Sequence, residues 1–465
     1  MLAIGGAAIA LLPGAPAFQL DPDLALALFV APVLLDAAYD TSLRDLRRNW
    51  RPVTGLVLVM VGLTTAAVAV VARSLVPGMS WSVAIALGAI VAPPDAAAAS
   101  AVLRQLRLPH RLVVILEGES MLNDAFALLV YRLAVRATMV SAVTLAQVST
   151  TLLVVFPGSV VAGWLLARIV LVCLRPLQDV PTSIVLQFVM TFGIWLLAEH
   201  VGLSSILTVV VFAITMARRA PREVSARMRV PSYAVWDTAV FVANVLAFVL
   251  IGLQLRPILG RSPSATLNDY FLVASAVVAT VILVRIVWVM SRIATVRWKM
   301  RNFGARHGRP VPTFRGGLIV SWCGMRGIVT LAAALALPTG TDAGATFPHR
   351  DLVVVCAFAV VFATLVLQGL TLKSLARALR LRDEDDPVQR ETKPARARLE
   401  QVEEVPTDES QDPANQRELR LEALKHRREA LHVLREREEI GDDAFHRLEW
   451  ELDISELHIT SRDSD

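Results

Sequence analysis

A cluster of polar side chains stands in the run LEGESMLNDA, inside an otherwise apolar segment over residues 111–131. In a helix, Ser120 and Asp124 share one face because they are four positions apart, and Glu119 and Asn123 share the adjacent face. One turn therefore presents a hydroxyl, an amide oxygen and a carboxylate. These are hard oxygen ligands, which suit Na⁺ and not soft transition metals.

The depth of Asp124 in a membrane would decide its chemistry. At a rise of about 1.5 Å per residue it lies roughly 20 Å along the helix from Arg111, near the middle of a bilayer core about 30 Å thick. Removal from water disfavours a bare carboxylate, so Asp124 is stabilised by binding either a proton or a cation. Mutually exclusive binding to one carboxylate is the simplest physical basis for ion exchange.

Structural ion pairs are the competing interpretation of these acids. Arg285 and Arg326 both lie inside apolar segments and require partners. For Asp124 we favour ion binding over such a pair. For Glu119 we favour the structural role, with Arg285 as its partner.

Two further acids lie where they could contribute to the same site. Asp36 belongs to the apolar run 24–39 and could face the same cavity, although its nearness to Arg44 also fits a position at the membrane surface. Asp95 ends the helix-breaking sequence APPD and can cap the half-helix that follows. Pro94 has no N–H to donate, but carbonyl oxygens near this break can bind a cation.

These residues must be positioned by membrane helices, each of which requires roughly 20 apolar residues. Candidate spans lie at residues 24–39, 53–72, 81–103, 111–131, 147–174, 183–200, 202–217, 235–255, 268–290, 316–337 and 350–372. A bilayer offers the backbone no hydrogen bonds, so these segments are predicted to be helices. Residues 1–12 are apolar but too short to span, which favours a truncated or misassigned start.

Composition and charge are those of a polytopic membrane protein. Hydrophobic residues make up 55% of the chain and charged residues 19%, against about a quarter charged in soluble proteins. Basic residues gather in alternate loops, at residues 44–51, 104–111, 168–175, 218–229 and 292–315. The positive-inside rule places these loops, and the tail after Lys373, in the cytoplasm. Bases confined to such loops argue against nucleic-acid binding, and the three cysteines contain no CxxC pair.

The predicted spans contain an inverted repeat. Two triplets of spans, at about 53–131 and 268–372, run in opposite directions, and the middle span of each is interrupted, by Ala92-Pro93-Pro94-Asp95 and by Gly324-Met325-Arg326-Gly327. Paired broken helices in inverted repeats indicate the binding site of a secondary transporter. The alternative is that Pro and Gly merely kink ordinary helices, which is less plausible for the pair than for either break alone.

The C-terminal part of the chain differs in composition. We predict a transmembrane domain, a cytoplasmic linker and a cytoplasmic helical tail, over residues 1–372, 373–415 and 416–465. The first part has a net charge of +13 and the remainder −8. Within the tail, dense charge interspersed with apolar residues predicts two amphipathic helices, at 416–437 and 441–459, around a turn at Gly441.

Five segments resemble the NhaP/NHE-type Na⁺/H⁺ exchangers, which are monovalent cation:proton antiporters. They are FVAPVLLDAAYDTSLRDLRRNWRP, LGAIVAPPDAAAASAVL, LEGESMLNDAFALLVY, FVLIGLQL and SWCGMRGIVTLAAALALP, in family order over roughly residues 5–372. EGESxxND together with GMRG is highly specific. The resemblance implies an all-α antiporter fold of thirteen helices, here truncated at its N-terminus, with two crossed discontinuous helices. It also implies a dimerisation domain beside the core domain, and hence a homodimer.

The same resemblance implies roles for individual residues. Asn123 and Asp124 would form the ion site of an electroneutral, elevator-like antiporter, completed by Ser120 and Asp36. Glu119 would pair with Arg285, and Arg326 would compensate the helix ends at the second break. The family commonly has Thr at position 94, so Pro94 leaves only a backbone carbonyl there.

The function predicted from the sequence is exchange of Na⁺, or Li⁺, for H⁺ across a bacterial plasma membrane, without a cofactor. K⁺/H⁺ exchange is the alternative that ion size and coordination leave open. A cation channel is less favoured, since no TVGYG-like filter is present. An intramembrane hydrolase with Ser120 as nucleophile would need a nearby base, and the histidines of this region fall in loops or at span ends.

Overall fold

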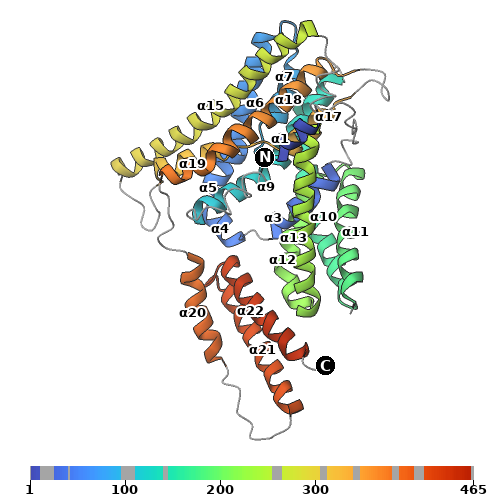
Figure 1. Ribbon diagram of the computed structural model, residues 1–465, viewed down its shortest axis with the longest axis vertical. Helices are drawn as coiled ribbons and strands as arrows, with labels where there is room; N and C mark the ends of the chain where they lie inside the picture. The colour runs from blue at the N-terminus through green and yellow to red at the C-terminus, as the bar shows by residue number, and fades with distance from the viewer. Residues whose placement is uncertain are drawn as a thin grey trace.

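The computed structural model is helical throughout the regular structure that it describes, as the sequence predicts (Figure 1). It describes residues 2–10, 26–39, 42–95, 110–139, 145–177, 179–253, 264–303, 312–338, 346–379, 387–402 and 413–461. Each of the predicted spans overlaps one or more helices in these ranges, and residues 96–103 of the span at 81–103 lie outside them. Within them, six helices are long and apolar enough to cross a membrane: Trp50–Leu75, Val154–Leu174, Val180–His200, Ala226–Leu253, Asn268–Phe303 and Arg350–Leu379.

One bundle of helices is built from the two predicted triplets. Its buried core is formed mainly by α6 (Val61–Leu75), α7 (Trp81–Val91), α9 (His110–Met139), α15 (Ser264–Phe303), α17 (Ile328–Leu335) and α18 (Arg350–Ala363). Helix α6 continues α5 (Trp50–Thr54) and the π-helix η2 (Gly55–Met60), and α18 continues into η3 (Thr364–Gln368) and α19 (Gly369–Leu379). Small side chains such as Ala84, Ala86 and Ala357 are fully buried there, because close helix approach is the main source of packing energy in a bilayer.

A second bundle lies beside the first. Its core joins η1 (Leu26–Val30), α3 (Ala31–Tyr39), α10 (Leu145–Leu174), α11 (Val180–His200) and α12 (Ser205–Glu223). Helix α13 (Ala226–Leu253) packs against α3 and α11, and the short helix α1 (Leu2–Ala10) packs against α13. A short helix, α4 (Leu43–Arg48), connects α3 to α5.

Both predicted helix breaks are present, and they meet. Helix α7 ends at Val91, and the second break separates α16 (Phe314–Trp322) from α17. The backbone N–H of Asp95 donates to the carbonyl of Met325 over 2.7 Å, which joins the two breaks directly. The half-helix predicted after the first break lies outside the described residues.

Three tail helices pack around a core of their own: α20 (Pro387–Gln401), α21 (Pro413–Glu436) and α22 (Asp442–Ser461). The two predicted tail helices correspond to α21 and α22, with Gly441 between them. Within the predicted linker over 373–415, residues 373–379 belong to α19 and residues 387–401 form α20. Ala395 and Leu399 give α20 an apolar stripe that is buried in the tail core, which the average composition of this segment does not reveal.

Candidate ion-binding site

The predicted ion-binding pair lies on α9 and is removed from solvent. Asn123 is fully buried and Asp124 is 6% exposed. The Asn123 Nδ2 amide donates to Glu119 Oε1 over 3.4 Å, while its buried Oδ1 makes no hydrogen bond in the described structure. A buried carbonyl oxygen without a donor is costly, which makes Asn123 Oδ1 a candidate ligand for a bound cation. Among the described residues, Asp124 forms no ion pair, so its charge is open to compensation by a bound ion.

The ion pair predicted between Glu119 and Arg285 is present. Both side chains are 1% exposed, and the guanidinium meets both carboxylate oxygens, with Nη2 and Oε2 2.8 Å apart. Nε and Nη2 of Arg285 also donate to the Val320 carbonyl, over 3.2 and 3.1 Å. A bidentate pair with further hydrogen bonds is the arrangement in which a buried ion pair is tolerated. Glu119 is therefore charge-compensated by the protein.

The two glycines of GMRG each make room for a charged side chain. A methyl group on Gly327 would overlap Oδ2 of Asp95, and one on Gly324 would lie 2.5 Å from Cδ of Arg285. Asp95 lies near enough to Asp124 for their carboxylates to repel each other. Gly327 in the second break therefore leaves room for Asp95, whose charge acts on Asp124. The capping role predicted for Asp95 concerns residues outside the described ranges.

Arg326 connects the two breaks more extensively than the sequence predicts. It is fully buried, and it donates from Nε to the Val91 carbonyl over 3.1 Å and from Nη2 to the Ala92 carbonyl over 3.2 Å. Both carbonyls belong to the end of α7, where the helix dipole favours a cation. Its Nη1 donates to the Gly324 carbonyl. Arg326 thus compensates helix ends at the first break as well as at the second, where the sequence placed it.

The remaining predicted ligands, Pro94, Asp36 and Ser120, lie on three different parts of the fold. Pro94 is buried within the first break, and Asp36 lies on α3, partly exposed, in the wall of a cavity of about 420 Å³. Asp124 is not among the described residues that line this cavity. The backbone of Ser120 belongs to α9, but the prediction for its hydroxyl lies outside the described side chains.

Sequence reasoning missed two buried polar residues of η3. Thr364 accepts a hydrogen bond of 3.0 Å from the backbone N–H of Arg326 and so fixes the second break. Gln368 is fully buried, and neither atom of its amide has a partner in the described structure. The presence of polar residues inside the apolar run 350–372 is the sequence signal that could have identified them.

Comparison with known proteins identifies the family. The sequence model described as "Sodium/hydrogen exchanger, transmembrane" matches residues 2–378. An uncharacterized Na⁺/H⁺ exchanger of Mycobacterium tuberculosis is 30% identical over 505 aligned positions, which cover 99% of this chain and 91% of that protein. A sodium, potassium, lithium and rubidium/H⁺ antiporter of Bacillus pumilus is 29% identical over 381 positions, which cover 80% of this chain and 56% of that protein.

The fold has a counterpart among solved structures. The sodium proton antiporter MjNhaP1 of Methanocaldococcus jannaschii superimposes with a TM-score of 0.59 at 19% identity, over 82% of this chain and 91% of that one. The sequence match extends over nearly all of the membrane helices. The chain therefore belongs to the sodium/hydrogen exchanger family of membrane antiporters.

Proposed function

We propose that this protein exchanges Na⁺ for H⁺ and that Asp124 binds either ion in turn. The observation that carries the proposal is the pairing of a buried Asp124, without an ion pair among the described residues, with a buried Asn123 oxygen that lacks a donor. Oxygen atoms of these two kinds bind Na⁺ by replacing part of its hydration shell. When the cation leaves, a proton stabilises the desolvated carboxylate instead.

Carbonyl oxygens at the first break are the natural supplement to these ligands, and Pro94 is the residue that would offer one. Ser120 and Asp36 remain proposed ligands on the basis of the sequence. Arg326 already occupies the carbonyls of Val91 and Ala92. The cation would therefore bind on the opposite side of the break, towards Asp95 and Asp124.

The charges at the site support electroneutral exchange. Arg285 compensates Glu119, and we assign the transported charge to the Asp124 carboxylate. One Na⁺ replaces one H⁺ on that carboxylate, and the net charge of the loaded site is then the same in both directions. Alternating access would come from an elevator-like movement of the bundle that contains α7, α9 and α17.

K⁺ is the second candidate cation. The Bacillus pumilus relative is named for sodium, potassium, lithium and rubidium. Asn123 and Asp124 supply oxygen ligands that do not by themselves exclude a larger ion, because coordination number and cavity size decide between the two cations. We retain Na⁺, with Li⁺, as the first substrate to test.

The proposed setting is a bacterial plasma membrane, with the protein as a homodimer. The arginine-rich loops 44–51 and 218–229 would face the cytoplasm by the positive-inside rule. The tail helices contact these same loops, so the tail would also be cytoplasmic.

Transport by acid-loaded everted vesicles tests the proposal. We expect Na⁺ or Li⁺ to dissipate the pH gradient with the wild-type protein and not with Asp124→Asn, because the amide cannot alternate between proton and cation. The matched control is Asp269→Asn, an exposed aspartate near the start of α15, which should transport normally. Activity with K⁺ alone would change the assigned substrate from Na⁺ to K⁺. Full activity of Asp124→Asn would refute the assignment of Asp124 as the ion-binding residue.

A further inference from the structure

The acidic tail and the arginine-rich face of the membrane domain are in direct contact. Figure 1 shows α20, α21 and α22 at one end of the membrane helices, next to α4 and α12. Arg44 Nη2 meets both oxygens of Glu391, at 2.6 and 2.9 Å, and Arg222 Nη2 meets Glu436 Oε1 at 2.6 Å. The opposite net charges of the two parts of the chain therefore face each other across a real interface.

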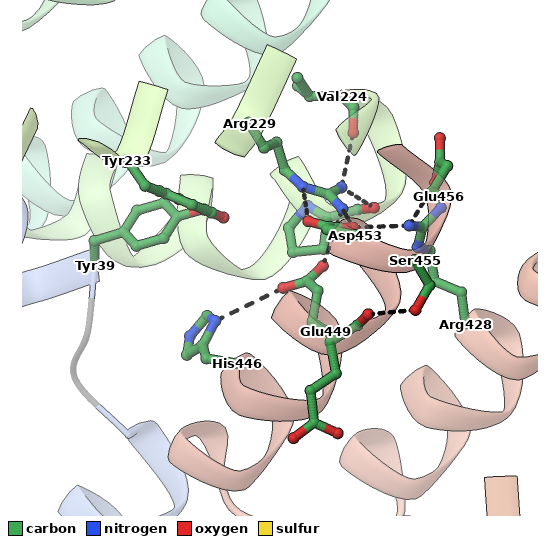
Figure 2. A network of polar contacts seen from close by, with 12 residues as sticks. Tyr39, Val224, Arg229, Tyr233, Arg428, His446, Glu449, Asp453, Ser455 and Glu456 are labelled. Atoms are coloured by element: carbon green, nitrogen blue, oxygen red, sulfur yellow. Dashed lines mark hydrogen bonds and ion pairs between the residues drawn. The ribbon is translucent and has the colours of Figure 1, made fainter. Parts of the chain in front are cut away.

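The centre of this interface is a buried ion-pair network around Arg229 (Figure 2). Nη2 and Nε of Arg229 donate to the two oxygens of Asp453, over 2.6 and 3.3 Å, and Glu449 Oε1 lies 3.6 Å from Nη2. Arg428 supports Asp453 from the tail side, with 2.7 Å between Nη2 and Oδ1. The side chains of Arg229, Asp453 and Glu449 are 3%, 1% and 4% exposed. Such a network forms only when α22 is docked.

The membrane domain holds its half of the network in place independently. Nη1 of Arg229 donates to the carbonyls of Pro221 and Val224, over 2.6 and 2.7 Å, at the end of α12. The guanidinium is therefore already oriented toward the tail. If α22 departed, Arg229 would lose both of its acidic partners, Glu449 and Asp453. The fixed guanidinium therefore defines where these two acids must lie when α22 is docked.

Helix α22 forms part of the wall of the cavity that contains Asp36. Its walls include Asp36 and Tyr39 from α3, Tyr233 and Trp236 from α13, and Glu449 and Trp450 from α22. The phenolic oxygens of Tyr39 and Tyr233 are 3.1 Å apart. The tail helix thus supplies one wall of the space that leads to a proposed ion ligand.

We propose that the arginine-rich face is a docking surface for α22 of the same chain, and that docked α22 closes this cavity to the cytoplasm. The fit is specific in shape as well as in charge. A methyl group on Gly441 would lie 2.6 Å from Nη2 of Arg44, and the Gly441 N–H donates to Glu391 over 2.6 Å. The consequence for transport rests on the proposed function, in which cytoplasmic cations pass Asp36. Docking of the tail would then slow exchange.

Labelling of a cavity residue tests closure without reference to transport. Ser232 lines the cavity and is 5% exposed. Ser232→Cys would be placed in a Cys173→Ser background, since the other cysteines are buried. A membrane-impermeant maleimide would be applied to everted vesicles. The labelling rate of the Cys173→Ser protein would be subtracted from that of the protein that also carries Ser232→Cys. We expect Glu449→Gln with Asp453→Asn to raise the labelling rate about tenfold if the tail is docked nine-tenths of the time.

The matched control lies on the same helix. Glu451→Gln removes a carboxylate of α22 that pairs with Arg396 of α20, and it should leave the labelling rate unchanged. The Arg222→Glu and Glu436→Arg single variants should each raise the rate, and the double variant should restore it, because the swapped pair can form again. Restoration would assign the raised rates of the single variants to the lost ion pair and not to either substitution alone. Equal rates in wild type, tail variants and control would overturn the proposal.

Transport by the same vesicles separates this inference from the proposed function. Faster Na⁺-driven exchange in the Glu449→Gln, Asp453→Asn variant would support closure as a brake. Faster labelling with an unchanged exchange rate would refute the inference that docking of α22 slows exchange. If no variant exchanges any cation, the proposed function fails, and the labelling rates alone still decide whether α22 closes the cavity.

Discussion

At the scale of single residues, two acids on neighbouring turns of α9 have different roles because their surroundings differ. Glu119 is compensated by Arg285, whereas Asp124, five positions later, has no ion pair among the described residues. Asn123 lies between them, with its amide directed at Glu119 and its oxygen left without a donor. The first acid therefore contributes to the fold, and the second can bind an ion.

Glu119→Gln should destabilise the protein by about 3–5 kcal/mol, because Arg285 would remain buried without a charge partner. Thermal unfolding in detergent measures the loss. The control is Glu199→Gln, which removes the partner of the half-exposed Arg132 and should change stability by less than about 1 kcal/mol. Equal losses in the two variants would contradict the structural role of Glu119.

At the scale of elements, the two broken helices are fastened to each other. Asp95 binds the backbone of Met325, and Arg326 binds the carbonyls that end α7. Each break therefore satisfies the polar backbone groups that the other exposes, which a bilayer interior cannot do. The same contacts fix the position of Asp95, whose charge acts on Asp124.

Gly327→Ala should impair exchange, because the added methyl group would displace Asp95. Overpacking costs about 1–3 kcal/mol, which corresponds to roughly five- to hundredfold lower occupancy of the working geometry. The initial rate of Na⁺-driven proton release in everted vesicles is the measurement. Gly193→Ala, at a helical position with open space around it, should keep the wild-type rate. A normal rate for Gly327→Ala would show that the position of Asp95 does not matter.

At the scale of the whole molecule, the tail is a folded unit seated on the membrane domain. Its core includes Leu431, Phe445 and Leu448, and its acids meet arginines from α4, α12 and α13. His432 is 5% exposed and packs on Phe445, with ring centroids 5.2 Å apart. This histidine makes the tail sensitive to pH.

Burial, together with the nearby charge of Arg222, lowers the pKa of His432 to about 4, against the opposing effect of Glu449. The unfolded tail has the ordinary value near 6.5, so it binds more protons than the folded tail between these two values. Stability is therefore complete above about pH 6.5 and falls as the pH drops toward 4.

Hydrogen exchange of α21 and α22 tests this prediction, with wild type and His432→Gln compared at the same pH. The difference in protection between the two proteins should shrink or reverse between pH 7 and pH 5, because the variant has no group to protonate there. A difference that stays constant across this range would contradict the assignment to His432.

The sequence by itself determined the membrane class, the helical spans, the two breaks, the tail helices α21 and α22 and the Glu119–Arg285 pair. The length of apolar runs, the charge of the loops and local motifs are enough to predict these features. Each feature depends on a single segment or on the cost of burying a charge. Only the tertiary structure decided that the breaks bind each other, that Arg326 reaches α7, that residues 387–401 form a packed helix and that α22 lies over the cavity of Asp36. These features join residues up to several hundred positions apart, and their contacts depend on how whole helices pack, which no local pattern specifies.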